Sequence, residues 1–156
     1  MTHLLWYIIG ILHIIAIILI SIYTLLVRKA SKLDLYFLLL FAMVNMHWLL
    51  YEGECFISYY YKETNENSNS VNEMNTILGK DLHTLLIGLF VIMYGINTYI
   101  VGKRQGINDF LIVSAIIMFI VCITLFRYEH INYYYYGVPN FLINFAIFLS
   151  VIYKLL

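Results

Sequence analysis

Histidine, glutamate and cysteine side chains gather near the end of the second apolar run of the sequence. His47, Glu54 and Cys55 fall within one short stretch, and His83 follows a polar segment at the start of the third run. His13 lies near the middle of the first run. Such side chains transfer protons, act as nucleophiles or bind zinc. We expect these residues to form a candidate polar site, with His47, Glu54, Cys55 and His83 towards the outer side of a membrane and His13 deeper within it.

A metal centre built from His47, Glu54 and His83 is one interpretation of this cluster. Zinc accepts such ligands, but the spacings typical of local zinc sites, His-Glu-x-x-His and Cys-x-x-Cys, do not occur in the sequence. On a continuous helix His47 and Glu54 would stand roughly 10 Å apart along the axis. Alternatively, the glutamates are solvated at the interface, and His13 and His47 form hydrogen bonds between helices. No cofactor is indicated beyond the zinc alternative.

These residues belong to a strongly apolar chain. Of its 156 residues, 63% are hydrophobic and 12% are charged, and the net charge is zero. Soluble domains are nearer half apolar and a quarter charged. A helix of about 20 mostly apolar residues crosses the hydrocarbon layer of a bilayer. We therefore predict an all-α integral membrane helical bundle in a single domain, residues 1–156, with the lipid bilayer as its partner. The charge balance argues against nucleic acid.

Five apolar runs predict the helices that position the site. They cover residues 4–27, 34–58, 82–101, 109–126 and 139–156, with a flexible outer loop at 62–80. The first run has no basic residue before it, which favours a retained helix over a cleaved signal peptide. Pro139 suits the first turn of the last helix. Asp34, Asp81 and Asp109 each precede an apolar run, where they can cap a helix.

Lysine and arginine set the expected orientation. Most of the basic residues fall on one side when the runs alternate across the membrane. These are Arg28, Lys29, Lys32, Lys103, Arg104 and Lys154. Because basic residues are retained on the cytoplasmic side, we predict about five transmembrane helices with the N-terminus out and the C-terminus in.

The third run carries a stripe of mostly small residues at alternating steps of four and three. It consists of Thr84, Gly88, Val91, Gly95, Thr98 and Gly102. Such residues share one helix face and let two backbones approach closely in lipid. We expect a neighbouring helix to press along this whole face.

The stretch from His47 to Tyr59 reads His-Trp-Leu-Leu-Tyr-Glu-Gly-Glu-Cys-Phe-Ile-Ser-Tyr. Its His-Trp pair, Gly-Glu-Cys turn and following Ser58 resemble uncharacterised small multi-spanning membrane proteins of giant DNA viruses and aquatic microbes. Ile77-Leu78-Gly79 is similar to a Leu-Gly element in that group. The resemblance covers residues 46–80 and implies a multi-spanning fold. It carries no activity.

Three functions follow as alternatives. The first is a structural or interaction component of a viral or host membrane, with self-association or another membrane protein as partner. The second is a membrane enzyme or a metal or redox protein that uses the His/Glu/Cys site, which requires that site to converge. The third is a small transporter or channel subunit, with His13, Asn97 and Asn144 lining a path. The sequence favours a protein that is not an enzyme.

Overall fold

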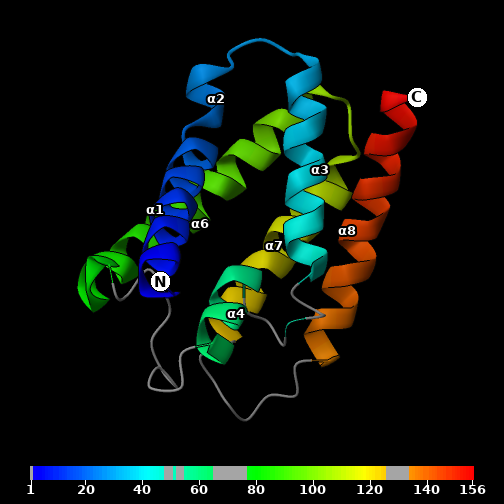
Figure 1. The fold of residues 1–156 in the computed structure, drawn as a ribbon. Coiled ribbons are helices and arrows are strands. Elements are labelled where there is room, and N and C mark those ends of the chain that lie inside the picture. Colours follow the sequence, from blue (N-terminus) through cyan, green and yellow to red (C-terminus); the bar gives the residue numbers. More distant parts are fainter. Residues whose placement is uncertain (1, 48–50, 52–54, 65–76, 126–133) are drawn as a thin grey trace.

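The computed structural model describes residues 2–47, 51, 55–64, 77–125 and 134–156. Its regular elements are all helices (Figure 1), as predicted. They are α1 (Thr2–Ser21), α2 (Tyr23–Leu26), α3 (Lys32–His47), α4 (Phe56–Thr64), α6 (Lys80–Arg104), α7 (Asp109–Leu125) and α8 (Tyr134–Leu155). Most of the expected outer loop at 62–80 lies outside the described residues.

The longer helices α3, α6, α7 and α8 close a ring around one core. α3 packs against α6 and α8, and α7 packs against the same two neighbours. At the centre, the ring of Tyr94 is surrounded by aromatic side chains from three helices. These are Phe37, Phe41, Phe90 and Phe119, with ring centroids 5.8, 5.0, 4.9 and 5.3 Å from that of Tyr94. Aromatic pairs at these separations stabilise a core beyond their buried area.

α1 and α2 lie outside this ring and pack against α6. The first helix was expected to run unbroken from 4 to 27, but a turn at Ile22 divides it. The break has a physical cause, since the side chain of Asn97 on α6 binds the carbonyls that end α1.

The second helix is not continuous over the expected range. The described part of α3 is Lys32–His47, Cys55 is not helical, and α4 begins at Phe56. The single helix predicted over 34–58 is therefore interrupted before Phe56, and the axial spacing expected for His47 and Glu54 on a continuous helix does not apply.

The last helix begins sooner than expected. α8 starts at Tyr134, so Pro139 lies inside the helix and not in its first turn. Proline has no backbone N–H, which leaves the carbonyl of Tyr135 without its usual helical partner. Tyr135 is exposed, so this carbonyl stands near the helix surface.

Three helices are long and apolar enough to cross a membrane: Leu4–Ser21, Lys80–Arg104 and Tyr135–Leu155. α7 is an apolar helix of 17 residues, and α3 has 16 residues. The prediction of membrane-spanning helices is thus supported for three of the five runs by length and composition.

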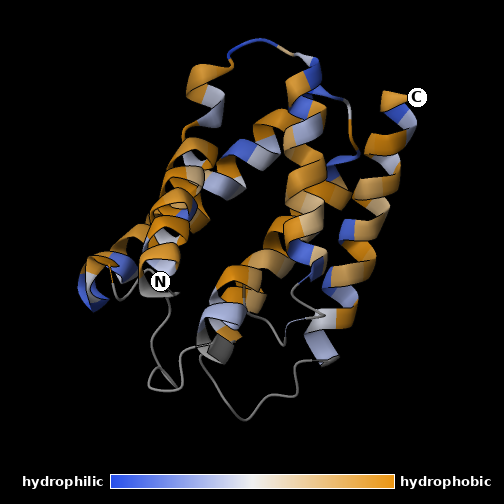
Figure 2. Ribbon diagram, in the orientation of Figure 1, coloured by the Kyte–Doolittle hydropathy of each residue, from blue (hydrophilic) through white to orange (hydrophobic). Residues whose placement is uncertain are grey.

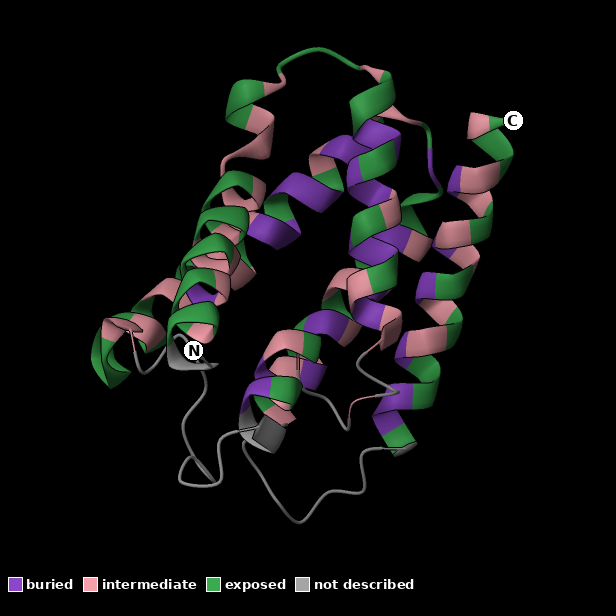
Figure 3. Cartoon of the chain, viewed as in Figure 1, coloured by how far each residue is buried: buried purple, intermediate pink, exposed green. Residues whose placement is uncertain are grey.

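Hydrophobic side chains face outward and amides face inward in this bundle. The helix surfaces that are exposed in Figure 3 are largely those coloured apolar in Figure 2. Leu12, Ile92 and Leu142 are 59%, 60% and 59% exposed. Asn97 and Asn144 are fully buried.

The basic turns lie together at one end of the bundle. Residues 27–31, residues 105–108 and the end of α8 form the upper end in Figure 1, and Thr2 and α4 lie towards the opposite end. The helices of the ring therefore alternate in direction along the chain.

Candidate functional site

Cys55 and His13 come together although they are 42 positions apart in the sequence. Cys55 Sγ lies 3.6 Å from His13 Nε2, a hydrogen-bonding distance for sulfur. Which of the two donates depends on the imidazole tautomer. α4 also contacts α1 where Trp6 and Tyr61 meet edge to face, with 5.7 Å between ring centroids. This ring pair is a second contact between α1 and the segment that holds Cys55 and α4.

His47 joins the end of α3 to the start of α4. Its Nε2 accepts a hydrogen bond of 3.3 Å from the backbone N–H of Phe56. That N–H belongs to the first residue of α4, and the first N–H groups of a helix have no partner within it. His47 therefore fixes the connection in which Cys55 lies.

A thiol beside an imidazole can act as a nucleophile, because the imidazole can accept the thiol proton. Cys55 is half-buried, whereas Cys122 is fully buried in the core, and both are free thiols. Cys55 therefore has a polar partner, whereas Cys122 is packed among apolar side chains.

The expected metal ligands do not gather in the described part of the chain. Glu54 lies outside the described residues. His83 lines a small hollow with Ile14 and Ile18 of α1, whereas His47 binds the start of α4. Among the residues that the structure describes, no three His, Cys, Asp or Glu side chains are grouped to hold a metal ion.

The C-terminal half of the α6 stripe packs against α7. A Cβ at Gly95 would lie 3.2 Å from Ile116 Cγ2, and one at Gly102 would overlap Ile112 Cδ1. Thr98 is fully buried between them and its hydroxyl donates to the carbonyl of its own helix four residues back. Small residues are required here because the two helices approach closely.

The first two positions of the stripe are open, which corrects the expectation of one continuous packed face. A Cβ at Gly88 would meet no atom of the described residues within 4 Å, and Thr84 is exposed. Near its start, α6 packs against α1 through a different face, which carries His83 and Ile87. α6 thus contacts α1 near its start and α7 further along.

Asn97 bridges the break between α1 and α2. Its Nδ2 donates to the carbonyls of Ile20 and Ser21 at 2.9 and 2.7 Å. In an unbroken helix these carbonyls would accept from residues 24 and 25. Its Oδ1 accepts from the hydroxyl and backbone N–H of Thr24. Asn97 therefore replaces helical hydrogen bonds on both sides of the turn at Ile22.

Asp34 is the centre of a buried polar network at the basic end. It is the third residue of α3, and its carboxylate accepts from Tyr23 Oη at 2.9 Å, Gln105 Nε2 at 3.2 Å and Ser31 N at 3.4 Å. Tyr23 and Gln105 were not singled out from the sequence, because only the fold brings the three segments together.

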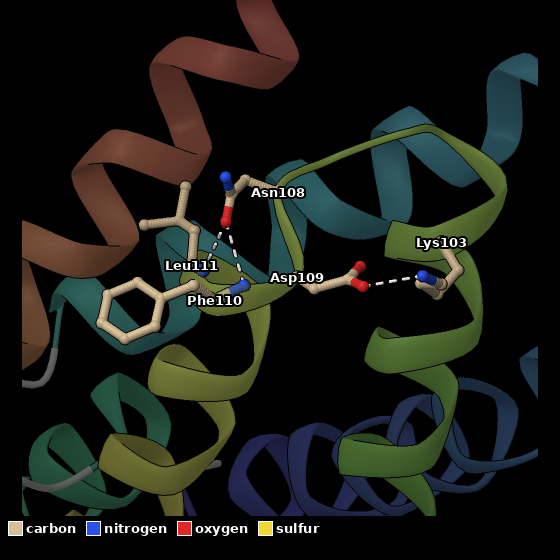
Figure 4. Close-up of polar contacts among 5 residues, drawn as sticks. All are labelled: Lys103, Asn108, Asp109, Phe110 and Leu111. Atoms are coloured by element: carbon tan, nitrogen blue, oxygen red, sulfur yellow. Dashed lines mark hydrogen bonds and ion pairs between the residues drawn. The ribbon is translucent and has the colours of Figure 1, made fainter.

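Asn108, and not Asp109, caps α7 (Figure 4). Asn108 Oδ1 accepts from the backbone N–H groups of Phe110 and Leu111 at 2.9 and 3.4 Å. Asp109 is the first helical residue and pairs with Lys103 Nζ at 2.7 Å. The predicted cap is thus one residue away, since Asn108 occupies the position where a side-chain oxygen reaches the free N–H groups.

A second set of buried amides joins α3 to α8. Asn140 Nδ2 donates to the backbone carbonyl of Asn45 at 3.0 Å. Asn144 Nδ2 donates to the carbonyl and side-chain oxygens of Asn140 at 2.8 and 3.0 Å. Asn140 therefore joins α8 to α3, and Asn144 bonds to Asn140 within α8, whereas Asn97 joins α6 to α1 and α2. The path proposed from His13, Asn97 and Asn144 would have to join two different helix interfaces.

Comparisons of this chain with protein-family models, with curated proteins and with solved structures gave no match. The resemblance carried by the stretch from His47 to Tyr59 therefore stays a prediction. The functional argument depends on the geometry of the chain itself.

Proposed function

We propose that this chain is a multi-pass integral membrane protein with five spans, N-terminus out and C-terminus in. Its role is structural or interactive, with lipid, a second copy or another membrane protein as partner. Three long apolar helices support this location, and the shorter α3 and α7 complete the ring with α6 and α8.

The observation that carries the proposal is the apolar exterior of the bundle, together with the amides that are buried between its helices. Large apolar side chains such as Leu12, Ile92 and Leu142 face outward over much of each helix. Monomeric soluble proteins rarely expose continuous apolar surface of this kind. Buried amides such as Asn97 and Asn140 donate to backbone carbonyls of neighbouring helices. Lipid supplies the apolar surroundings that this exterior requires, and polar contacts between helices are typical of membrane bundles.

The distribution of charge supports the proposed orientation. Lys29, Lys32, Arg104 and Lys154 all belong to the end of the bundle that holds the C-terminal residues. On the positive-inside rule this end faces the cytoplasm. The short connections at 27–31 and 105–108 suit the rule, because it applies best to short loops.

The filled interior of the bundle supports a structural role over a conducting one. Tyr94, Phe41 and Phe119 occupy the centre of the ring and are at most 1% exposed. A path for a polar solute would have to displace this aromatic cluster.

Alkaline carbonate extraction of membranes tests the location. The chain, expressed with a tag, should stay with the membrane pellet at pH 11 and enter solution only with detergent. Release by carbonate alone would contradict an integral protein. A single-span protein and a peripheral protein of the same host serve as controls.

A reactive thiol is the second candidate function, and the Cys55–His13 contact favours it. The 3.6 Å separation places an acceptor for the thiol proton beside the sulfur. This candidate requires that Cys55 react much faster than Cys122.

A further inference from the structure

A cavity opens at the basic end between the α6–α7 loop and the last turns of α8. Its volume is about 490 Å³. The loop contributes Gly106 and Asn108, and α8 contributes Ser150, Tyr153 and Lys154. The cavity is open to the surroundings of the bundle, and none of the residues considered for the thiol site lines it.

Lys154 supplies this cavity with positive charge. Its side chain is exposed, and within the described ranges no carboxylate forms an ion pair with it. Lys103, at the same end of the bundle, differs because Asp109 neutralises it at 2.7 Å. The ammonium of Lys154 is therefore available to an anion that enters the cavity.

Asn108 supplies an oriented hydrogen-bond donor at the same rim. Its Oδ1 is committed to the N–H groups of Phe110 and Leu111. The amide nitrogen lies on the other side of the side chain from these bonds (Figure 4). An anion beside Lys154 would thus meet an N–H₂ group whose direction is fixed by the helix cap.

The outer wall of the cavity is apolar. Leu149 and Tyr153 line it and are 51% and 82% exposed. Tyrosine favours the level of lipid headgroups, because its ring is apolar and its hydroxyl is hydrated. The cavity therefore combines an anion-binding rim with a surface that suits an acyl chain.

We propose that this cavity binds the phosphate headgroup of an anionic phospholipid. Lys154 and Asn108 contact the phosphate oxygens, and Leu149 and Tyr153 contact the glycerol and the start of the acyl chain. A lysine near the cytoplasmic membrane surface attracts anionic headgroups, and Lys154 is the basic residue that lines this cavity. This inference rests on the proposed membrane location. It names anionic phospholipids as the class of ligand that the protein binds there.

Displacement of a fluorescent anionic phospholipid from the full-length protein in neutral detergent tests the proposal. The competitors are phosphatidylglycerol, phosphatidylcholine and soluble glycerol 3-phosphate. Phosphatidylglycerol should compete at least about fivefold better than phosphatidylcholine, and Lys154→Gln should weaken it by about that factor. Asn108→Asp keeps a good helix cap but removes the donor, so it should weaken binding while helix content stays unchanged.

Lys32→Gln is the matched control, because it removes a charge from an exposed lysine at the same end that does not line the cavity. Equal competition by the two phospholipids would overturn the proposal, as would an effect of Lys32→Gln as large as that of Lys154→Gln. Competition by glycerol 3-phosphate at the same concentration would assign the site to a soluble phosphate. Carbonate extraction is scored separately, so failure of the membrane location is distinguishable from failure of this site.

Discussion

Asn97 is the residue on which the break in the first helix depends. Its side chain donates to Ile20 and Ser21 and accepts from Thr24. Backbone groups freed by a break in a membrane helix need such partners, because lipid offers none. The sequence marked Asn97 as a polar residue within an apolar run. Its partners lie 73 to 77 positions away, so their identity could not be predicted without the fold.

Replacing Asn97 by leucine should destabilise the folded protein. The change removes the donor and the acceptor and leaves backbone groups of α1 and α2 unpaired, at a cost of about 1–3 kcal/mol. Unfolding in mixed micelles by circular dichroism measures the loss. Ile96→Leu, at the neighbouring exposed position, is the control. The bridging role would be refuted by equal stabilities of the two variants.

Cys55 should react with a neutral maleimide in detergent well before Cys122. It is half-buried and has an imidazole acceptor at 3.6 Å, whereas Cys122 is fully buried. His13→Phe should slow the labelling several-fold, because the thiol loses its proton acceptor. Peptide mass spectrometry over a time course follows each cysteine.

His83→Phe provides the matched histidine control for that experiment. It lies on α6 against Ile14 and Ile18, in a different contact from the thiol. The same slowing in both variants, or equal labelling of Cys55 and Cys122, would remove the chemical role of His13. The sequence identified His13, His47 and Cys55 as candidates, but their pairing depends on the non-helical Cys55 before α4, which periodicity did not reveal.

α6 is the element that organises the bundle. Near its start it packs against α1, and further along it packs against α7 through Gly95 and Gly102. The stripe of small residues predicted that this helix would be packed closely. It did not predict that the packing would be confined to one half, because the direction of a neighbouring helix depends on the whole bundle.

Gly102→Ala and Gly88→Ala form a matched pair of variants that tests the packing of α6 against α7. A Cβ at Gly102 would overlap buried Ile112, so this variant should lose about 1–3 kcal/mol through overpacking. A Cβ at Gly88 meets nothing within 4 Å, and alanine favours helix by up to about 1 kcal/mol. Unfolding midpoints in the same micelle measure both. Similar destabilisation of the two would contradict the placement of α7.

The apolar runs located the helices, while their ends depended on specific contacts. Runs of apolar residues predict α6 and α7 closely, because charged residues flank both runs in the sequence. The end of α1 and the start of α4 differ from the prediction, since Asn97 and the His47–Phe56 hydrogen bond act there. Such contacts join distant segments, and a local pattern does not contain them.

At the scale of the whole molecule, outward apolar surfaces and inward amides fit a bilayer, and the basic turns define one end of the bundle. α3, with 16 residues, covers about 24 Å, which is short for the roughly 30 Å hydrocarbon layer. The five-span proposal therefore depends most on whether α3 crosses the bilayer. If α3 crosses, the residues before it and the start of α6 face opposite sides.

Cysteine accessibility at Lys29 and Lys80 tests the five-span account most directly. Both residues are exposed, one at the basic end and one at the start of α6. Lys29→Cys and Lys80→Cys are made in a Cys55→Ser, Cys122→Ala background and treated with a membrane-impermeant maleimide on intact cells. We predict that position 80 is labelled directly, and that position 29 is labelled only after permeabilisation. Labelling of both positions from the same side would contradict the proposed topology.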